Sequence, residues 1–131
     1  MIVADASWII ALRDPSDPHH SSAIGLNDAT VDDVIILHPL TFAECLVGPA
    51  RLGQLDTAAD AIRAAFEIVD IDVDAPLRWA NLRAGTSLRL PDAIVLDTAI
   101  VHAASMILTF DQRLASEAKT RAIASPAPGA V

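Results

Sequence analysis

Hydrophobic positions along the chain follow two alternating patterns, short runs of β-branched residues and longer stretches with helical periodicity. The short runs predict four strands and a possible short fifth, at residues 1–3, 34–37, 67–71, 106–109 and 121–123. The longer stretches predict helices at residues 8–13, 20–26, 41–52, 55–66, 75–88, 92–105 and 112–119. Strands that alternate with helices are typical of a parallel sheet. We therefore expect an α/β fold with a central parallel β-sheet of four to five strands flanked by helices.

The composition indicates one compact domain with an aliphatic core. The chain has 131 residues, of which 53% are hydrophobic and only 4% aromatic, and this length suits a single domain. We expect the domain to span residues 1–124. Residues 125–131, with the sequence SPAPGAV, are rich in Pro, Ala and Gly and are expected to form a short flexible tail.

Several features of the sequence point to a soluble, cytoplasmic protein with no membrane span. Cys45 is the only cysteine, so no internal disulfide can form. The N-terminus lacks the basic region of a signal peptide. The longest apolar run, residues 93–110, is interrupted by Asp97 and His102, which argues against a membrane helix.

The charge balance limits how the protein could bind nucleic acid. Seventeen acidic residues against nine basic ones give a net charge of −8, and Lys119 is the only lysine. Nucleic-acid binding ordinarily relies on basic surface that neutralises phosphates. A nuclease of this composition would have to obtain its phosphate affinity from bound metal and a few local arginines.

Four acidic residues occupy positions where the ends of parallel strands would gather. Asp5 and Asp111 directly follow predicted strands, whereas Glu44 and Asp92 begin helices. Three of them have ordinary alternatives, because Glu44 fits a capping box with Thr41, and Asp92 and Asp111 suit helix starts. Asp5 is harder to explain in this way, because a charge beside a buried strand is costly without a partner.

The four acids together indicate a metal site. Carboxylates that converge at one edge of a sheet repel one another unless cations or protons lie between them. Mg²⁺ and Mn²⁺ prefer oxygen ligands, and two such ions can activate water and stabilise a leaving oxygen in phosphodiester cleavage. No Gly-rich phosphate loop, zinc spacing or Ser–His–Asp order offers another catalytic set.

The segments around these acids resemble the PIN domain family of ribonucleases. The segments are MIVADASWIIALR, PLTFAECLVGPARLG, RLPDAIVLDTAI and MILTFDQRL, they occur in the family's order, and together they span nearly the whole chain. The resemblance implies a three-layer α/β/α fold that is usually dimeric. For a chain of this length it implies a VapC-type toxin of a type II toxin–antitoxin system, whose antitoxin places a basic segment in the acidic site.

Carried over position by position, the resemblance also implies roles for individual residues. The implied metal ligands, for Mg²⁺ or Mn²⁺, are Asp5, Glu44, Asp92 and Asp111. Ser7 and Thr109 are implied to hold a metal-bound water or a neighbouring carboxylate. We also predict that Arg89 and Arg113, which flank two of the acids, contact the phosphates of an RNA substrate, although arginines beside acids also form ordinary ion pairs.

Two polar positions leave alternatives open. The family usually has a small residue where this chain has Asp97, five positions after Asp92. We expect Asp97 to be a solvated surface acid, with a supporting position at the rim of the site as the alternative. His38 precedes Pro39 at a strand end, where it could line the cleft or lie in an ordinary loop.

Other functions fit the sequence less well. A receiver domain would need paired acids after its first strand and a lysine after its last, and Lys119 lies inside a predicted helix. An Asp-x-Asp phosphatase is opposed by Ser7, which stands where the second Asp would be. The main alternative is a degenerate PIN domain that binds RNA or protein without cleaving it.

Overall fold

Four parallel strands form one sheet in the computed structural model, which describes residues 1–126. The strands are β1 (Ile2–Ala4), β2 (Ile35–Leu37), β3 (Glu67–Ile68) and β4 (Met106–Leu108). Their order is β3-β2-β1-β4, so β1 is central and pairs with both β2 and β4. The predicted fifth strand is reduced to a single parallel bridge between Met106 and Ala124.

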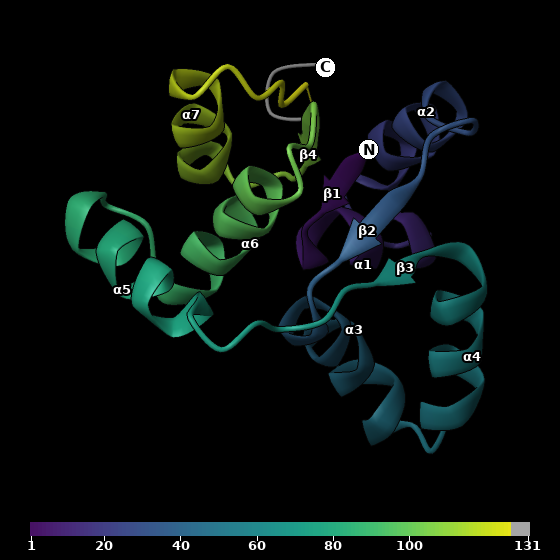
Figure 1. The fold of residues 1–131 in the computed structure, drawn as a ribbon. Coiled ribbons are helices and arrows are strands. Elements are labelled where there is room, and N and C mark those ends of the chain that lie inside the picture. The colour runs from purple at the N-terminus through teal and green to yellow at the C-terminus, as the bar shows by residue number, and fades with distance from the viewer. Residues whose placement is uncertain (127–131) are drawn as a thin grey trace.

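Helices cover both faces of the sheet (Figure 1). They are α1 (Ala6–Arg13), α2 (His20–Ala29), α3 (Pro39–Arg51), α4 (Leu55–Ala65), α5 (Ala75–Gly85), α6 (Leu90–Val101) and α7 (Gln112–Thr120). Figure 1 shows α1 to α4 on one side of the strands and α5, α6 and α7 on the other. The predicted α/β class, with its parallel sheet between helical layers, is confirmed.

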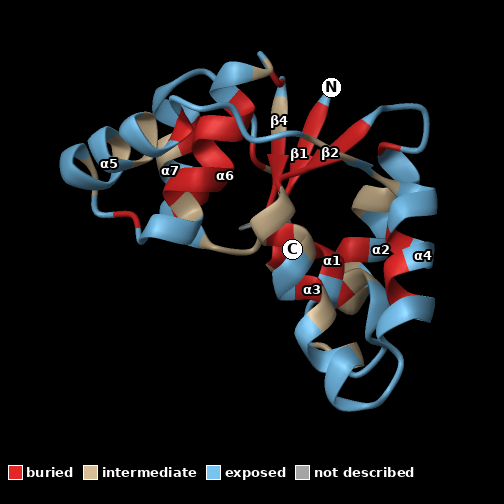
Figure 2. Cartoon of the chain, turned by 60° about the horizontal axis from the view of Figure 1, so that its bottom comes forward, coloured by how far each residue is buried: buried red, intermediate tan, exposed pale blue. Residues whose placement is uncertain are grey.

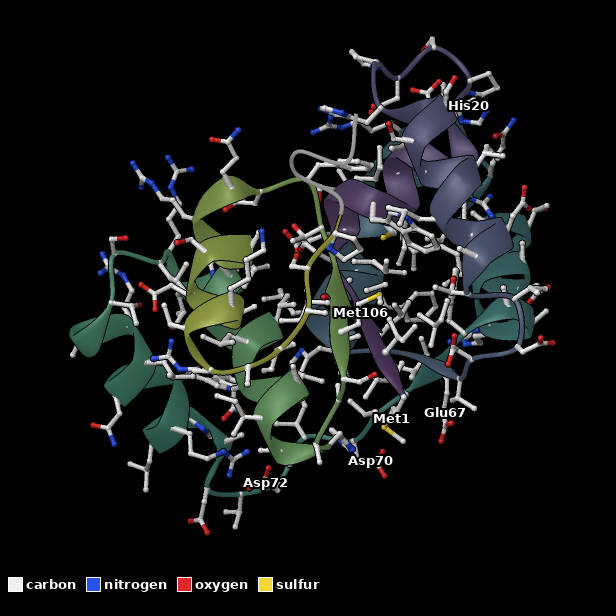
Figure 3. All side chains as sticks on the ribbon, turned by 90° about the horizontal axis from the view of Figure 1, so that it is seen from above. Met1, His20, Glu67, Asp70, Asp72 and Met106 are labelled. Atoms are coloured by element: carbon white, nitrogen blue, oxygen red, sulfur yellow. The ribbon has the colours of Figure 1, made fainter. Side chains whose placement is uncertain are left out.

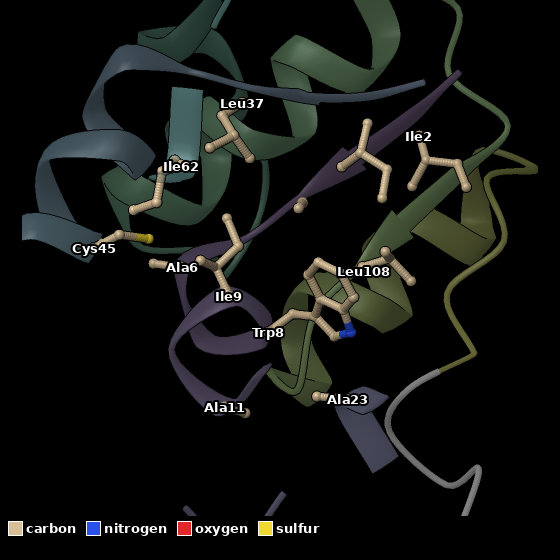
Figure 4. Close-up of a cluster of buried hydrophobic side chains, with 12 residues drawn as sticks. Ile2, Ala6, Trp8, Ile9, Ala11, Ala23, Leu37, Cys45, Ile62 and Leu108 are labelled. Atoms are coloured by element: carbon tan, nitrogen blue, oxygen red, sulfur yellow. The ribbon is translucent and has the colours of Figure 1, made fainter. Parts of the chain in front are cut away.

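The two faces of the sheet bury separate hydrophobic clusters because side chains alternate along each strand. Ile2 and Ala4 of β1 belong to the first cluster, together with Trp8 and Ile62. Figure 4 shows this cluster, with the indole of Trp8 at its centre and Leu108 of β4 close by. The intervening Val3 belongs to the second cluster, on the side of α6 and α7. This alternation explains why the central strand β1 is apolar at every position.

The start of α3 differs from the predicted one. The helix begins at Pro39, because proline is well suited to the first turn, and His38 is its N-cap. The helix ends where Gly53 takes a positive φ of 69°, a conformation that glycine adopts without steric cost. The chain then reverses into α4, as the sequence predicted.

Serine 125 does not belong to a flexible tail. Ser125 is buried, and its hydroxyl donates to the carbonyl of Ile107 at 3.1 Å. Ser125 is therefore held in place, and residues 127–131 of the predicted tail lie outside the described part of the chain. None of the helices within residues 1–126 is both long and apolar enough to span a membrane.

Candidate active site

Asp5 lies at the carboxyl end of the central strand and is held by two hydroxyl groups. Its oxygen Oδ2 accepts hydrogen bonds from Ser7 Oγ at 2.9 Å and from Thr109 Oγ1 at 2.8 Å. Asp5 is buried, with 8% of its surface exposed. The two donors fix the orientation of the carboxylate. Ser7 and Thr109 thus support a neighbouring carboxylate, one of their two predicted roles, while contact with a metal-bound water stays a prediction.

The same two hydroxyls also hold the turn between β4 and α7. Ser7 Oγ accepts from the backbone N–H of Phe110 at 3.0 Å, and Thr109 Oγ1 accepts from the backbone N–H of Asp111 at 3.0 Å. Asp111 in turn caps α7, because its Oδ1 accepts from the backbone N–H of Leu114 at 2.8 Å. One Asp111 oxygen, Oδ1, therefore caps the helix, as the sequence allowed. The second oxygen, Oδ2, does not take part in the cap.

Glu44 and Asp92 are contributed by helices from opposite layers. Asp92 lies in the first turn of α6, as predicted. The capping-box explanation for Glu44 is wrong, because α3 begins two residues before Thr41 and His38 forms its cap. Glu44 therefore lies in the second turn of α3, where it has no capping function.

One open cavity of about 520 Å³ joins three of the predicted acids. Its lining residues are Glu44, Arg89, Pro91, Asp92, Asp111, Gln112 and Arg113. Both predicted phosphate-binding arginines thus lie at the same cavity as the acids. Asp5 is outside this lining, but its charge acts on both Glu44 and Asp92. The tertiary structure therefore brings residues from the two ends of the chain and from two middle segments into one site.

The acids raise one another's affinity for protons. The pKa of Asp92 rises from 3.8 to about 6, first because burial disfavours its charge and then because Asp111 and Asp5 repel it. Arg89 and Arg113 partly offset this rise. Burial, followed by repulsion from Asp5 and Asp92, also raises the pKa of Glu44. A cluster that resists ionisation in this way favours a bound cation or shared protons.

The donor set fits a magnesium-type ion better than a preformed zinc cage. Within the described residues, no three or more His, Cys, Asp or Glu side chains are grouped so that together they could hold a metal ion. Closed zinc sites use His and Cys. Mg²⁺ keeps several of its waters and needs only one or two direct carboxylates. Carboxylates spaced around an open, polar cavity meet that requirement.

Asp97 departs from its predicted place. It is buried, with 4% of its surface exposed, and its carboxylate accepts from Arg78 and from Trp79 Nε1. It lines a separate small crevice together with His38 and Arg78. Asp97 is therefore neither a solvated surface acid nor part of the rim of the acidic cavity. Periodicity could not reveal its burial, because its partners come from a different helix.

Sequence reasoning missed two residues that line the cavity, Pro91 and Gln112. Each is adjacent in sequence to a predicted ligand, at the start of α6 and of α7. That adjacency was the available signal, since the first turns of these helices border the carboxyl edge of the sheet. His38 belongs to the crevice of Asp97 and is not among the residues that line the acidic cavity.

Comparisons with known proteins agree with this architecture. The model of the PIN domain family matches residues 2–119. No curated protein shows a matching sequence. A chain of a toxin–antitoxin complex from Klebsiella pneumoniae is 27% identical, with a TM-score of 0.74, over 88% of this chain and 91% of that one.

Two further solved structures share the fold. VapC20 of Mycobacterium tuberculosis, a toxin that cleaves the sarcin–ricin loop, is 18% identical with a TM-score of 0.73, over 89% of this chain and 95% of that one. FitAcB of Neisseria gonorrhoeae is also 18% identical, with a TM-score of 0.69, over 95% of this chain and 96% of that one. With a family match over nearly its whole length and the sheet order and acidic edge described above, the chain belongs to the PIN domain family.

Proposed function

We propose that this protein is a divalent-metal-dependent ribonuclease that acts as the toxin of a toxin–antitoxin pair. The observation that carries the proposal is the meeting of Glu44, Asp92 and Asp111 at one cavity, beside the held carboxylate of Asp5. The similar proteins that are described as a sarcin–ricin loop cleaving toxin and as a toxin–antitoxin complex support it.

The residues of the site have distinct roles in this proposal. Asp5 is a preorganised ligand, because two hydroxyls hold one of its oxygens and leave the other for a cation. Asp92 and Glu44, whose pKa values are raised, bind the cation or hold a proton when it is absent. A bound Mg²⁺ or Mn²⁺ supplies Lewis acidity and lowers the pKa of water. Asp111 completes the acidic wall on the side of α7.

Arg89 and Arg113 supply positive charge in an otherwise acidic protein. Both line the cavity, and both lower the pKa of Asp92 by their charge. A planar guanidinium pairs well with phosphate oxygens. We expect these two arginines to bind phosphates that flank the cleaved bond, so their replacement by Gln should weaken RNA binding more than it lowers the maximal rate.

The direct test is RNA cleavage with and without metal. The protein should cut RNA in Mg²⁺ or Mn²⁺ and stop when EDTA is added. Asp5→Asn and Asp92→Asn should each lose most activity, because a neutral amide binds a hard cation poorly. Asp56→Asn is a matched control, since Asp56 is an exposed acid in the first turn of α4 and should retain full activity. Cleavage that persists in excess EDTA would reject the mechanism, and RNA binding without cleavage would indicate a non-catalytic module.

The expected partner is an antitoxin with a basic segment that enters the acidic cavity. Opposite charges steer association, so the association rate should fall as salt rises. Purified complex should be inactive on RNA, and substitution of single arginines in the antitoxin should restore cleavage. If no arginine substitution restores cleavage, inhibition does not depend on insertion of a basic segment.

We also expect a homodimer, which light scattering of the isolated protein would reveal.

A further inference from the structure

Helix α5 packs against α6 and is only partly buried. Ala75 is its only fully buried residue, Leu82 is half-buried against the second hydrophobic cluster, and Leu77 is 68% exposed. Figure 2 shows α5 as a mostly exposed helix beside α6, whose central residues 93–99 are buried. Burial of apolar surface ordinarily holds a helix in place. Polar contacts therefore add to this limited apolar burial in fixing the orientation of α5.

Those polar contacts centre on Asp97 of α6. Its Oδ1 accepts from Arg78 Nε at 2.8 Å, and its Oδ2 accepts from Trp79 Nε1 at 3.1 Å and from Arg78 Nη2 at 3.2 Å. Both carboxylate oxygens are thus occupied by adjacent residues of α5. Because two different side chains of one helix turn bind the same carboxylate, the contact sets the rotation of α5 as well as its distance from α6.

The remaining side of the Arg78 guanidinium is also occupied. Asp72 accepts from Arg78 Nη2 at 2.6 Å and from Nη1 at 2.8 Å. Figure 3 shows Asp72 on the loop that leads into α5. The hydrogen bonds from Arg78, and then its charge, lower the pKa of Asp72 to about 2. Every guanidinium nitrogen of Arg78 therefore donates to a carboxylate, so Arg78 is not available as a phosphate ligand.

Trp79 extends this network to the start of α3. Its ring packs edge-to-face against the imidazole of His38, with centroids 5.4 Å apart. His38 caps α3, because its Nδ1 accepts from the backbone N–H of Leu40 at 3.0 Å. Burial lowers the pKa of His38, although Asp97 opposes this, and the neutral ring keeps Nδ1 free to accept. A continuous series of contacts thus runs from α6 through α5 to α3.

The two ends of this series carry metal-ligand candidates from opposite walls of the acidic cavity. Asp92 precedes Asp97 by about 7.5 Å along α6, and Glu44 follows His38 by about 9 Å along α3. Stability alone does not explain the network, since apolar residues often replace a buried ion pair without loss. We propose that Asp97 is a positioning residue that, through Trp79 and His38, sets the spacing of Glu44 from Asp92 and so the affinity of the cavity for a divalent ion.

This inference rests on the proposed function, and its test measures metal binding directly. The probe is Mn²⁺, titrated by calorimetry into the full chain at neutral pH, with metal-induced change in melting temperature as a second readout. Loss of a residue that orients a metal ligand usually weakens metal binding ~10–100-fold. Asp97 does not contact a ligand directly, so Asp97→Asn should raise the Kd for Mn²⁺ by about tenfold, the lower end of this range. Asp72→Asn, which leaves the three hydrogen bonds to Asp97 in place, should change the Kd less than twofold.

Two further variants separate positioning from folding. Trp79→Phe keeps a ring against His38 and removes only the indole N–H, so it should fold and bind Mn²⁺ several-fold more weakly. The double variant D97L/R78M should recover stability by apolar packing and still bind Mn²⁺ weakly. In cleavage assays, Asp97→Asn should need more metal for half-maximal rate and approach the wild-type rate at saturating metal.

The outcomes are distinguishable. If wild-type protein binds no Mn²⁺ and cuts RNA in EDTA, the proposed function itself fails. If wild-type protein binds Mn²⁺, and both Trp79→Phe and D97L/R78M bind it with the wild-type Kd, the positioning role of Asp97 is overturned. Weak binding that D97L/R78M corrects along with stability would also overturn it, because Asp97 would then act only through folding.

Discussion

Removal of the Asp92 charge should stabilise the metal-free protein. The structure raises the Asp92 pKa from 3.8 to about 6, which corresponds to about 3 kcal/mol of destabilisation at neutral pH, at ~1.36 kcal/mol for each pH unit. Asp92 is only partly buried, so water and salt reduce part of this penalty. Loss of a first-turn acid also costs ~0.3–1 kcal/mol. We expect Asp92→Asn to gain about 1–2 kcal/mol in EDTA at pH 7.5, or about 3–8 °C in melting temperature.

The gain should depend on pH with a defined sign. The folded state holds the Asp92 proton more tightly than the unfolded state, so the wild-type protein becomes more stable as pH falls through 6. The effect levels off below the unfolded value of 3.8, where the advantage of Asp92→Asn should vanish. The ion pair of Asp72, whose pKa is lowered to about 2, has the opposite effect. It stabilises the folded state above pH 3.8, and this stabilisation is lost as the pH falls from 3.8 towards 2. Wild-type stability without metal should therefore be greatest between these regimes, near pH 4–5.

Melting curves at several pH values, with EDTA or Mg²⁺, test this reasoning. Mg²⁺ at ~100 times its dissociation constant should add roughly 2.7 kcal/mol to the wild type and much less to Asp92→Asn. Asp56→Asn is again the control, because it removes an exposed first-turn acid without neighbouring repulsion. If Asp92→Asn melts lower than wild type in EDTA, as Asp56→Asn should, and Mg²⁺ still stabilises it fully, Asp92 is an ordinary helix-start acid.

Four further substitutions test the packing and the turns. Thr109→Val removes a donor to the buried Asp5, so urea unfolding should show a loss of about 1–3 kcal/mol, and an unchanged midpoint would contradict the hydroxyl network. Leu108→Ala, at a fully buried position of β4, should cost about 2–5 kcal/mol by the same measurement. Ala122 has a φ of 59°, so Ala122→Gly should raise stability by about 0.5–1 kcal/mol, whereas Ala115→Gly inside α7 should lower it by ~1 kcal/mol.

Local patterns predicted the elements of this fold well because the central strands β1 and β2 are buried on both faces. The runs 34–37 and 106–108 are entirely apolar, and each contains a strand. The boundaries shifted where capping decided them. The apolar pattern predicted that α3 would start at residue 41, but the helix starts at Pro39 with His38 as its N-cap. A proline in the first turn and a side-chain cap determine the start of a helix.

The acidic edge of the sheet was also predictable. In a parallel sheet all strands point the same way, so residues that directly follow the strands must gather at one edge. Asp5 and Asp111 meet this condition by position alone. Glu44 and Asp92 join them because each lies within the first two turns of a helix that starts near that edge.

The sequence by itself determined the class of fold, the place of the four acids and their likeness to the PIN family, because strand order along the chain and residue type suffice for these. Only the tertiary structure decided the environment of Asp97. Its partners Arg78 and Trp79 lie 19 and 18 positions earlier, and helical periodicity describes one helix at a time. The packing of α5 on α6 turns an expected surface acid into a buried ion pair, because the free energy of a charge depends on what surrounds it and not on its own helix.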